Sequence, residues 1–406
     1  MVQRPSTALR AWRYDMQELS RRRVIQQSLL AGAGLALLPE FGWLAAAQVG
    51  LDLIPFDDIP ENFQFRRPGA EDTPGANALG IDLREQTGPK TPVTSTYIVS
   101  HYGNPAVDAA TWTLAVDGSA GRPLSFTFDE IKRRPRVEKT VTFECGGNRE
   151  AVLHRMFSTV TWTGCSLRSL LEEARPSRDV LEAVFWGADQ GMETIRGAMY
   201  PMNFARSMSL QDAMDSDAIL AYEADGQPLP RVHGFPVRLV VPGWYGVSNV
   251  KWLTRIELSP RRFMGRFMGR DYVTIMGRQV GDRVEYTETS VTKILVKSVI
   301  ARVARPAGGG NGNVTVTGMA LGDGTPIQRV EVQVDGGAWQ PARLEPNSNP
   351  FMWTFWSLGV PALVPGAHTV ASRAFDRQGR TQPTDLALKR SNWENNAIWT
   401  RRIRVS

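Results

Sequence analysis

The first residue in the chain that is suited to metal chemistry is Cys145. It follows a β-branched and aromatic run at 141–143 and precedes Gly146-Gly147-Asn148. A strand that ends in this way presents a thiol at a sharp bend. Glycines permit positive φ and the close approach of a bulky ligand, and a thiolate is a soft metal ligand. A lone cysteine is more often a small buried residue, so the pattern by itself does not decide for a metal ligand.

A second candidate is His233, one of four histidines in the chain. It lies in the loop LPRVHGFPVR, flanked by Arg231 and Arg238. A histidine between two arginines in a loop with glycine and proline is typical of a residue that lines a pocket for an anion. A solvent-exposed loop histidine fits the same pattern.

The stretch PGWYGVSNVKWL (242–253) is a third candidate. A glycine-rich turn leads into Ser248, Asn249 and Lys251. Backbone N–H groups next to a cation suit an anionic ligand such as a phosphate. The alternative is a tight turn between strands with Lys251 in solvent. A fourth stretch, GADQG at 187–191 with Asp189 at its centre, is interpreted as a plain turn after the strand VLEAVFW.

Residues 1–47 have the features of an export signal. Three consecutive arginines at 21–23 precede a modest apolar stretch and three alanines at 45–47. Such a pattern predicts a twin-arginine signal peptide, with cleavage before Gln48. The alternative, a short buried helix, leaves the arginines without a role. We therefore expect a periplasmic, exported protein without a membrane span in its mature chain.

The elements that must position these residues change in character along the chain. Residues 48–95, rich in proline and glycine, are expected to form an extended arm. From 96 to 288, strand-like runs alternate with short helical stretches, and this predicts an α+β domain. Its last part, 259–288, is interpreted as a basic connector. The helical stretches are expected at 126–134, 166–174 and 203–214.

Residues 289–406 have a different pattern, with about seven short strands separated by Gly, Asp and Asn turns, typical of an immunoglobulin-like β-sandwich. We expect this domain to contact the first domain and a second subunit in a homodimer. The composition, 42% hydrophobic and 22% charged, fits one large or two ordinary domains.

Charge and cysteine content exclude several classes of protein. The net charge of +6 comes partly from 1–47, and the other basic residues are scattered, so no nucleic-acid module is indicated. Cys145 and Cys165 are the two cysteines, and no haem-attachment or zinc spacing occurs. Cys165 is expected as a small buried residue in a turn that enters a helix. The motifs of P-loop nucleotide binding, serine hydrolysis and zinc proteolysis are absent.

Taken together, the segments resemble the sulfite oxidase family of molybdopterin-dependent oxidoreductases over residues 90–406. The matching segments, in chain order, are Cys-x-Gly-Asn at 145–148, AYEADGQPLPRVHGFPVRLVVPGWYGVSNVKWL at 221–253, DGGAWQPA at 335–342, AFDRQGRTQP at 374–383 and WENNAIWTRRIRV at 393–405. The resemblance implies a molybdopterin-binding catalytic domain, an immunoglobulin-like dimerisation domain and a molybdenum–molybdopterin cofactor.

The resemblance also implies roles for individual residues. Cys145 would be the protein thiolate on molybdenum, and Tyr272, Arg149 and His101 would be catalytic. The hydroxyl group of Tyr272 would face the substrate. The residues implied to hold the pterin and its phosphate are Tyr97, Ser100, His101, Asp189, His233, Arg238, Ser248, Asn249 and Lys251.

Two departures from the family pattern concern the substrate. Sulfite-oxidising members have Arg-Asn-His where this chain has Val99-Ser100-His101, and an arginine where it has Glu150. Arg149 and Arg155 are the nearby candidates to replace these charges. The segment YIVSHYGNPAVD (97–108) resembles the sulfane dehydrogenase branch of the family more than the sulfite-oxidising members.

The implied activity is the oxidation of sulfite to sulfate by oxygen-atom transfer. Because the sequence contains no haem module, the electrons are expected to pass to a separate acceptor, a c-type cytochrome. One alternative is a sulfane dehydrogenase-like enzyme that acts on carrier-bound or other sulfur species. The alternative from another class is a non-catalytic binding or assembly scaffold that has kept the fold.

Overall fold

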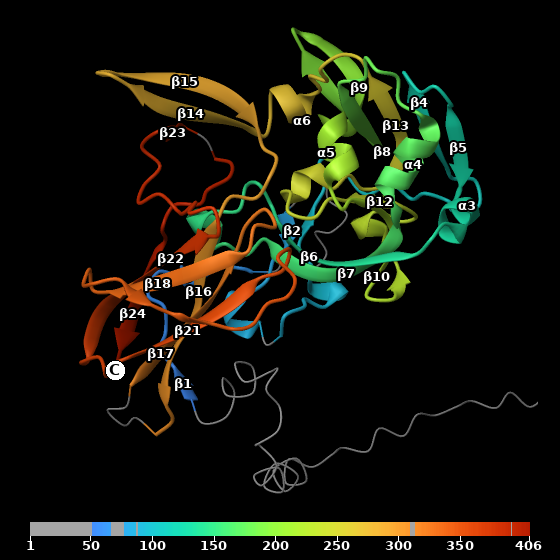
Figure 1. Cartoon of the computed structure of the whole chain (residues 1–406). Coiled ribbons are helices and arrows are strands. Elements are labelled where there is room, and N and C mark those ends of the chain that lie inside the picture. The colour runs from blue at the N-terminus through green and yellow to red at the C-terminus, as the bar shows by residue number, and fades with distance from the viewer. Residues whose placement is uncertain (1–50, 66–76, 87, 309–312, 391) are drawn as a thin grey trace, which may run out of the picture. The chain divides into compact units, whose positions relative to one another are not determined.

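Figure 1 shows the protein as a computed structural model, which describes residues 51–65, 77–86, 88–308, 313–390 and 392–406. The predicted signal peptide, 1–47, lies outside the described residues, as do 48–50 and 66–76 of the predicted arm. Strands predominate, and the helices are short. Among the described residues, no helix is both long and apolar enough to span a bilayer.

Two sheets form the first half of the described chain. Their strands are β4 (Thr113–Gly118), β5 (Leu124–Thr127), β6 (Val137–Glu144), β7 (Phe157–Ser166), β8 (Glu182–Ile195), β9 (Ala198–Ser209), β10 (Ile219–Ala224), β11 (Gln227–Pro228), β12 (Arg238–Val240) and β13 (Leu253–Ser259). One sheet has the order β11-β10-β7-β6, with β12 also paired to β10, and the other has the order β5-β4-β13-β8-β9. Strands β13 and β4 run parallel.

The strand that leads to Cys145 belongs to a well-packed sheet. Strand β7 is buried along nearly its whole length, between β6 and β10. Val141 and Phe143 of β6 pack into a core cluster with Val160 and Trp162 of β7, and the Phe143 and Trp162 rings stack with centroids 5.3 Å apart. Because the end of β6 is fixed by this packing, the residue that follows it has a defined position.

Three short helices cover the sheets, each begun by a hydroxyl side chain that caps free backbone N–H groups. They are α3 (Phe128–Arg133), α4 (Leu167–Ala174) and α5 (Leu210–Asp215), with Thr127, Ser166 and Ser209 as N-caps. The apolar stripe of α4 is buried. The predicted helices at 126–134 and 166–174 are confirmed in type, with shorter bounds.

Three local predictions were wrong. The predicted helix at 203–214 begins only at Leu210, because 203–209 completes β9. Residues 187–191 lie inside β8, where the register against β9 shifts between Trp186 and Gln190, and so they form an irregularity in a strand and not a turn. Cys165 is buried as expected, but it lies in β7, before α4 begins.

The second half forms the predicted β-sandwich. Its strands are β16 (Lys297–Pro306), β17 (Val314–Leu321), β18 (Ile327–Val334), β19 (Gln340–Pro341), β20 (Arg343–Leu344), β21 (Thr354–Val360), β22 (Gly366–Asp376) and β24 (Thr400–Val405), joined by β1 (Leu51–Leu53) from the arm. The sheets have the orders β1-β16-β17-β21-β20 and β19-β18-β22-β24. Alternate side chains of both sheets form one apolar core around Trp356.

The predicted basic connector contains structure that its sequence did not indicate. It holds the short helix α6 (Arg266–Gly269) and the hairpin of β14 (Val273–Val280) and β15 (Arg283–Ser290), which also pairs with β23 (Lys389–Arg390). Figure 1 shows this hairpin, in gold, extending away from the two sheets of the first half. In the arm, β2 (Asn77–Leu79) pairs with β3 (Ile98–Val99). Tyr272, directly before β14, is thereby held between the helix and the hairpin.

Candidate functional site

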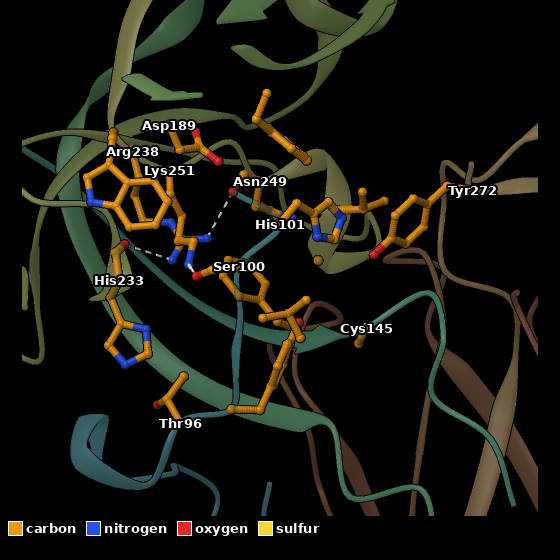
Figure 2. Close-up of a pocket in the computed structure, with 17 residues that line it drawn as sticks. Thr96, Ser100, His101, Cys145, Asp189, His233, Arg238, Asn249, Lys251 and Tyr272 are labelled. Atoms are coloured by element: carbon orange, nitrogen blue, oxygen red, sulfur yellow. Dashed lines mark hydrogen bonds between the residues drawn. The ribbon is translucent and has the colours of Figure 1, made fainter. Parts of the chain in front are cut away.

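Most of the residues predicted for the site line one cavity, which has an empty volume of about 690 Å³. Figure 2 shows their side chains converging from strand ends and loops. The predicted residues that line it are Tyr97, Ser100, His101, Cys145, Asp189, His233, Arg238, Asn249, Lys251 and Tyr272. Ser248 is buried beside the lining, and Arg149 lies outside it.

Cys145 occupies the turn directly after β6 and is buried. Its N–H donates a hydrogen bond to the Met156 carbonyl (3.1 Å), and its own carbonyl accepts one from the Asn148 N–H (2.9 Å). Burial raises the pKa of the Cys145 thiol to about 11. A metal that binds this sulfur must therefore displace a firmly held proton.

The two glycines after Cys145 make room for aromatic rings. A Cβ atom on Gly146 would lie 3.4 Å from the Tyr272 ring, and one on Gly147 would lie 3.1 Å from the Trp393 ring. The sequence suggested that the glycines admit a ligand. In the structure they let Tyr272 and Trp393 pack against the turn that carries the thiol.

Aromatic side chains surround the Cys145 end of the cavity. The Tyr272 ring stacks on Trp393 (4.0 Å between centroids) and on His101 (5.5 Å). His101 also contacts Phe204 and Phe267, at 5.3 and 4.5 Å. Burial raises the pKa of the Tyr272 hydroxyl well above its usual value, whereas burial, and then the charge of Lys251, lowers the pKa of His101 to about 4. At neutral pH both rings are therefore uncharged.

The other end of the cavity carries buried cations. The Lys251 ammonium donates hydrogen bonds to Ser100 Oγ and to the Val232 carbonyl, both at 2.9 Å. The Arg238 guanidinium donates to the carbonyls of His233 and Asn249, both at 3.0 Å. Burial lowers the pKa of Lys251, and the charge of Arg238 lowers it further. Two buried like charges destabilise each other, so an anion bound between them would be strongly favoured.

His233 and Asn249 belong to this cationic end. His233 is buried, so its alternative interpretation as an exposed loop histidine was wrong. Burial and the charges of Lys251 and Arg238 lower the pKa of His233 to about 3. The amide of Asn249 accepts from the Val241 N–H (2.6 Å) and donates to the Tyr245 carbonyl (3.1 Å). Asn249 therefore shapes the turn through backbone contacts, and its hydrogen-bonding groups are largely occupied.

Two buried polar atoms near the cavity have no hydrogen-bond partner among the described residues. They are Asp189 Oδ1 and Ser248 Oγ. Burial raises the pKa of the Asp189 carboxyl group. Buried polar atoms are normally satisfied, and unsatisfied ones in a cavity indicate a missing ligand. An acceptor at Asp189 and a hydroxyl at Ser248 suit a ligand with both N–H donors and acceptor oxygens.

The two arginines proposed to replace the missing charges, Arg149 and Arg155, do not line the cavity, although the charge of Arg149 lowers the pKa of Cys145. Val99 lines the cavity, and Glu150 is exposed outside it. Arg155 is buried and donates hydrogen bonds to the carbonyls of Gln64 and Phe65 in the arm. Arg149 is absent from the lining, so its predicted catalytic role remains a prediction. The arginine that lines the cavity among the described residues is Arg238, whose guanidinium binds the carbonyls of His233 and Asn249.

Several lining residues were not predicted from the sequence. They are Thr96, Val99, Phe143, Phe204, Gly246, Val247 and Trp252. All except Phe204 lie within two positions of a predicted site residue, so proximity along the chain was the available signal. Phe204 had no such signal, because its strand was predicted as a helix.

A bulky cofactor that carries its own metal ligands fits this cavity. No three His, Cys, Asp or Glu side chains come together as a metal site in the part of the chain that the structure describes. Cys145 would therefore supply one ligand, and the others would come from the cofactor. The cationic end and the unsatisfied atoms of Asp189 and Ser248 fit a pterin with a phosphate group.

Comparison with known proteins agrees with this fit. Residues 101–267 match the oxidoreductase molybdopterin binding domain, and residues 288–406 match the Mo-co oxidoreductase dimerisation domain. The sulfite oxidase of Gallus gallus is 34% identical over 71% of this chain and 67% of its own length. The chain belongs to the sulfite oxidase family. It is therefore a molybdopterin-dependent oxidoreductase, and its cofactor is molybdenum–molybdopterin.

Other members show the breadth of the family. The mitochondrial sulfite oxidase of Homo sapiens is 31% identical over 85% of this chain and 68% of its own length. The nitrate reductase [NAD(P)H] of Hordeum vulgare is 31% identical over 78% of this chain, which spans 39% of that protein. Among solved structures, the sulfane dehydrogenase SoxCD from Paracoccus pantotrophus has a TM-score of 0.68 at 26% identity, covering 80% of this chain and 86% of that one. Family membership therefore leaves the substrate open.

Proposed function

We propose that this protein oxidises a sulfur compound by oxygen-atom transfer at a molybdenum centre held by Cys145. The observation that carries this proposal is the arrangement in one cavity of a buried thiol beside an uncharged tyrosine hydroxyl, opposite a buried pair of cations. When bound, the molybdenum cofactor supplies two-electron redox chemistry and the transfer of an oxygen atom.

One group of residues would hold the cofactor, and another group would orient the substrate. Lys251 and Arg238 would hold the phosphate group of the cofactor through charge-assisted hydrogen bonds. Asp189 and Ser248 would accept from and donate to the pterin. Cys145 would hold the metal at the opposite end.

At the substrate end, Tyr272 keeps its phenolic proton at neutral pH and can donate it in a hydrogen bond to a substrate oxygen. His101 is neutral there and packs beside Tyr272. The Phe204 ring lines this end and limits the access of water, which strengthens any hydrogen bond made inside it.

Sulfite is the first candidate substrate, supported by relatives that are named sulfite oxidases and are 31–34% identical to this chain. A sulfur lone pair would be the nucleophile, and sulfate would be the product. A sulfur atom carried on a protein or another sulfane is the second candidate. Three observations favour it: Val99 lines the cavity where sulfite-oxidising members have an arginine, the described lining contains no arginine other than Arg238, and a structural neighbour is a sulfane dehydrogenase.

The proposed setting of the enzyme is the periplasm, after export through the twin-arginine pathway. The dimerisation-domain match supports a homodimer. The two electrons of each turnover would pass to a separate acceptor, for which a c-type cytochrome is proposed.

The test is a substrate screen with purified protein of known molybdenum content. Steady-state turnover is measured with sulfite, and in parallel with a persulfide-bearing carrier protein, using cytochrome c as acceptor. Turnover with either substrate is the expected result, and the ratio of the two kcat/KM values identifies the preferred one. A fully molybdenum-loaded protein that oxidises neither would contradict the proposed function.

A further inference from the structure

A buried ion pair lies directly behind the cysteine of the site. Glu144, the last residue of β6, immediately precedes Cys145, and Lys297, the first residue of β16, belongs to the β-sandwich. The Lys297 ammonium group pairs with Glu144 Oε1, and the two side chains are 1% and 0% exposed. A residue from the second domain thus reaches the turn that carries the thiol.

The Glu144 carboxylate is also part of the hydrogen-bond network that shapes this turn. Asn148 Nδ2 donates to Glu144 Oε1 (3.3 Å), and Asn148 Oδ1 accepts from the Met156 N–H (3.1 Å). The Met156 carbonyl in turn accepts from the Cys145 N–H (3.1 Å). Lys297, Glu144, Asn148 and Met156 therefore form a continuous chain of contacts that ends at the backbone of Cys145.

Stability alone does not explain this pair. Desolvation of two charges offsets most of their attraction, and apolar residues of similar volume often stabilise a protein equally well. Glu144 Oε2 has no partner among the described residues, which adds to the cost. A costly charged pair next to the thiol indicates a role at the site.

The pair also acts on the thiol electrostatically. Glu144 is the residue before Cys145, and its carboxylate pairs with the Lys297 ammonium group. The two side chains therefore place an oriented pair of opposite charges beside the sulfur. Groups beyond the direct ligands commonly tune a metal through such charges and hydrogen bonds.

We propose that Lys297 and Glu144 are positioning residues for the sulfur of Cys145, so that the β-sandwich contributes to the geometry and the reduction potential of the metal site. This inference rests on the proposed role of Cys145 as the metal ligand. It assigns the second domain a function at the site in addition to its match to a dimerisation domain.

The experiment compares Glu144→Gln and Lys297→Met with the wild-type holoenzyme. Glu144→Gln keeps the shape of the side chain and its bond to Asn148, so it is the variant expected to fold most readily. For each protein we would measure the electron paramagnetic resonance spectrum of the Mo(V) state and the midpoint potential, together with turnover per molybdenum. The expected result is an altered spectrum and a shifted potential in both variants, with turnover per molybdenum lower by about tenfold to a hundredfold.

Arg302→Met is the matched control, because Arg302 is another buried cation of β16 whose guanidinium donates to the carbonyls of Arg84 and Gln86 in the arm. This control is expected to lower the unfolding temperature and leave the Mo(V) spectrum unchanged. If Lys297→Met fails to fold, the Mo(V) spectrum and midpoint potential of Glu144→Gln alone test the proposal.

A wild-type spectrum and potential in loaded Glu144→Gln would overturn the proposal, whatever its unfolding temperature. A Cys145→Ser holoenzyme separates this outcome from a failure of the proposed function. If Cys145→Ser also leaves the spectrum unchanged, the assignment of the metal ligand is wrong, and the inference about Lys297 and Glu144 falls with it.

Discussion

The two ends of the cavity differ in how they satisfy buried groups. At the Lys251 end, two buried cations lie beside Asp189 Oδ1 and Ser248 Oγ, which lack partners among the described residues, whereas at the Cys145 end aromatic rings pack against each other and the lining hydroxyl and imidazole groups are uncharged. The first end is electrostatically incomplete and requires an anion to stabilise it. The second end is complete in its packing and leaves a thiol and a hydroxyl as its reactive groups.

This difference indicates how one cofactor can be both tightly held and reactive. Binding energy comes from charge-assisted contacts at the end far from the chemistry, where it does not depend on the redox state of the metal. The reactive end is lined by Phe204 and Tyr272, with Trp393 stacked on Tyr272, and these rings give it low polarity and little water. The comparison predicts that substitutions at one end change cofactor content, whereas substitutions at the other change turnover.

The largest effect is expected from Cys145→Ser. Loss of the thiolate ligand should lower turnover by about 10³-fold or more, which corresponds to about 4 kcal/mol of activation free energy. Because the cationic end remains intact, the pterin should stay bound. Assay of kcat per bound pterin checks this. A variant that loses the pterin together with its activity would show that Cys145 anchors the cofactor, contrary to the division proposed.

The next largest effect is expected from Lys251→Met. Loss of one charge-assisted contact, worth about 1.5–3 kcal/mol, should lower cofactor affinity by about tenfold to a hundredfold. The kcat of the molecules that retain cofactor should change little. Pterin content and kcat per molybdenum check the two parts, with the exposed lysine variant Lys132→Met as control. Unchanged pterin content would show that Lys251 does not bind the phosphate group of the cofactor.

An effect of about 2 kcal/mol is expected from acidification of the cofactor-free protein. The pKa values of His101 and His233 are lowered to about 4 and about 3 in the folded state, against about 6.5 in the unfolded chain. As pH falls below 6.5, the unfolded state binds protons first, so stability present above this pH is lost. Each histidine should lower the unfolding free energy by roughly 1 kcal/mol between pH 7 and 5.5.

Chemical unfolding at the two pH values checks this expectation. The variant His233→Gln should lose about half of the pH dependence that the two histidines contribute. If it retains the full dependence of the wild type, the buried, uncharged state assigned to His233 is wrong.

The smallest effect is expected from Val99→Arg. This substitution introduces a cation into the lining of the cavity and should lower the KM for sulfite by about tenfold, the value of one modest charge-assisted bond. Steady-state kinetics check it. If sulfite is oxidised efficiently by the wild type and Val99→Arg changes nothing, the missing arginine has no bearing on the substrate, and the argument for a sulfane loses its main support.

Local patterns in the sequence were sufficient for most of the fold. Short strand-like runs between Gly, Asp and Asn turns predicted the sandwich, and the stretch at 166–174 predicted α4. The strand at 198–209 was missed because its second half was interpreted as the start of a helix. Residues 187–191 resembled a turn because they contain two glycines. One of these, Gly191, lacks a side chain because the Tyr102 ring packs where a Cβ atom would lie. The reason for a glycine at position 191 is therefore a contact with a distant segment. A local sequence pattern cannot reveal such a contact.

The sequence predicted which residues belong to the site better than it predicted where their side chains point. The segments at 97–101, 145–148 and 231–253 supplied most of the residues that line the cavity. Their roles depend on where side chains point, and Arg155 illustrates this, because its guanidinium turns to backbone carbonyls of the arm. The Glu144–Lys297 pair joins residues 153 positions apart and left no signal in either segment.

The central claim is that Cys145 completes the metal coordination at the uncharged end of the cavity. X-ray absorption spectroscopy at the molybdenum edge counts the sulfur atoms bound to the metal and tests this claim most directly. The account predicts three sulfur neighbours in the wild-type holoenzyme, two from the cofactor and one from Cys145, and two in molybdenum-loaded Cys145→Ser. Two sulfur neighbours in the wild type, or three retained in Cys145→Ser, would contradict it.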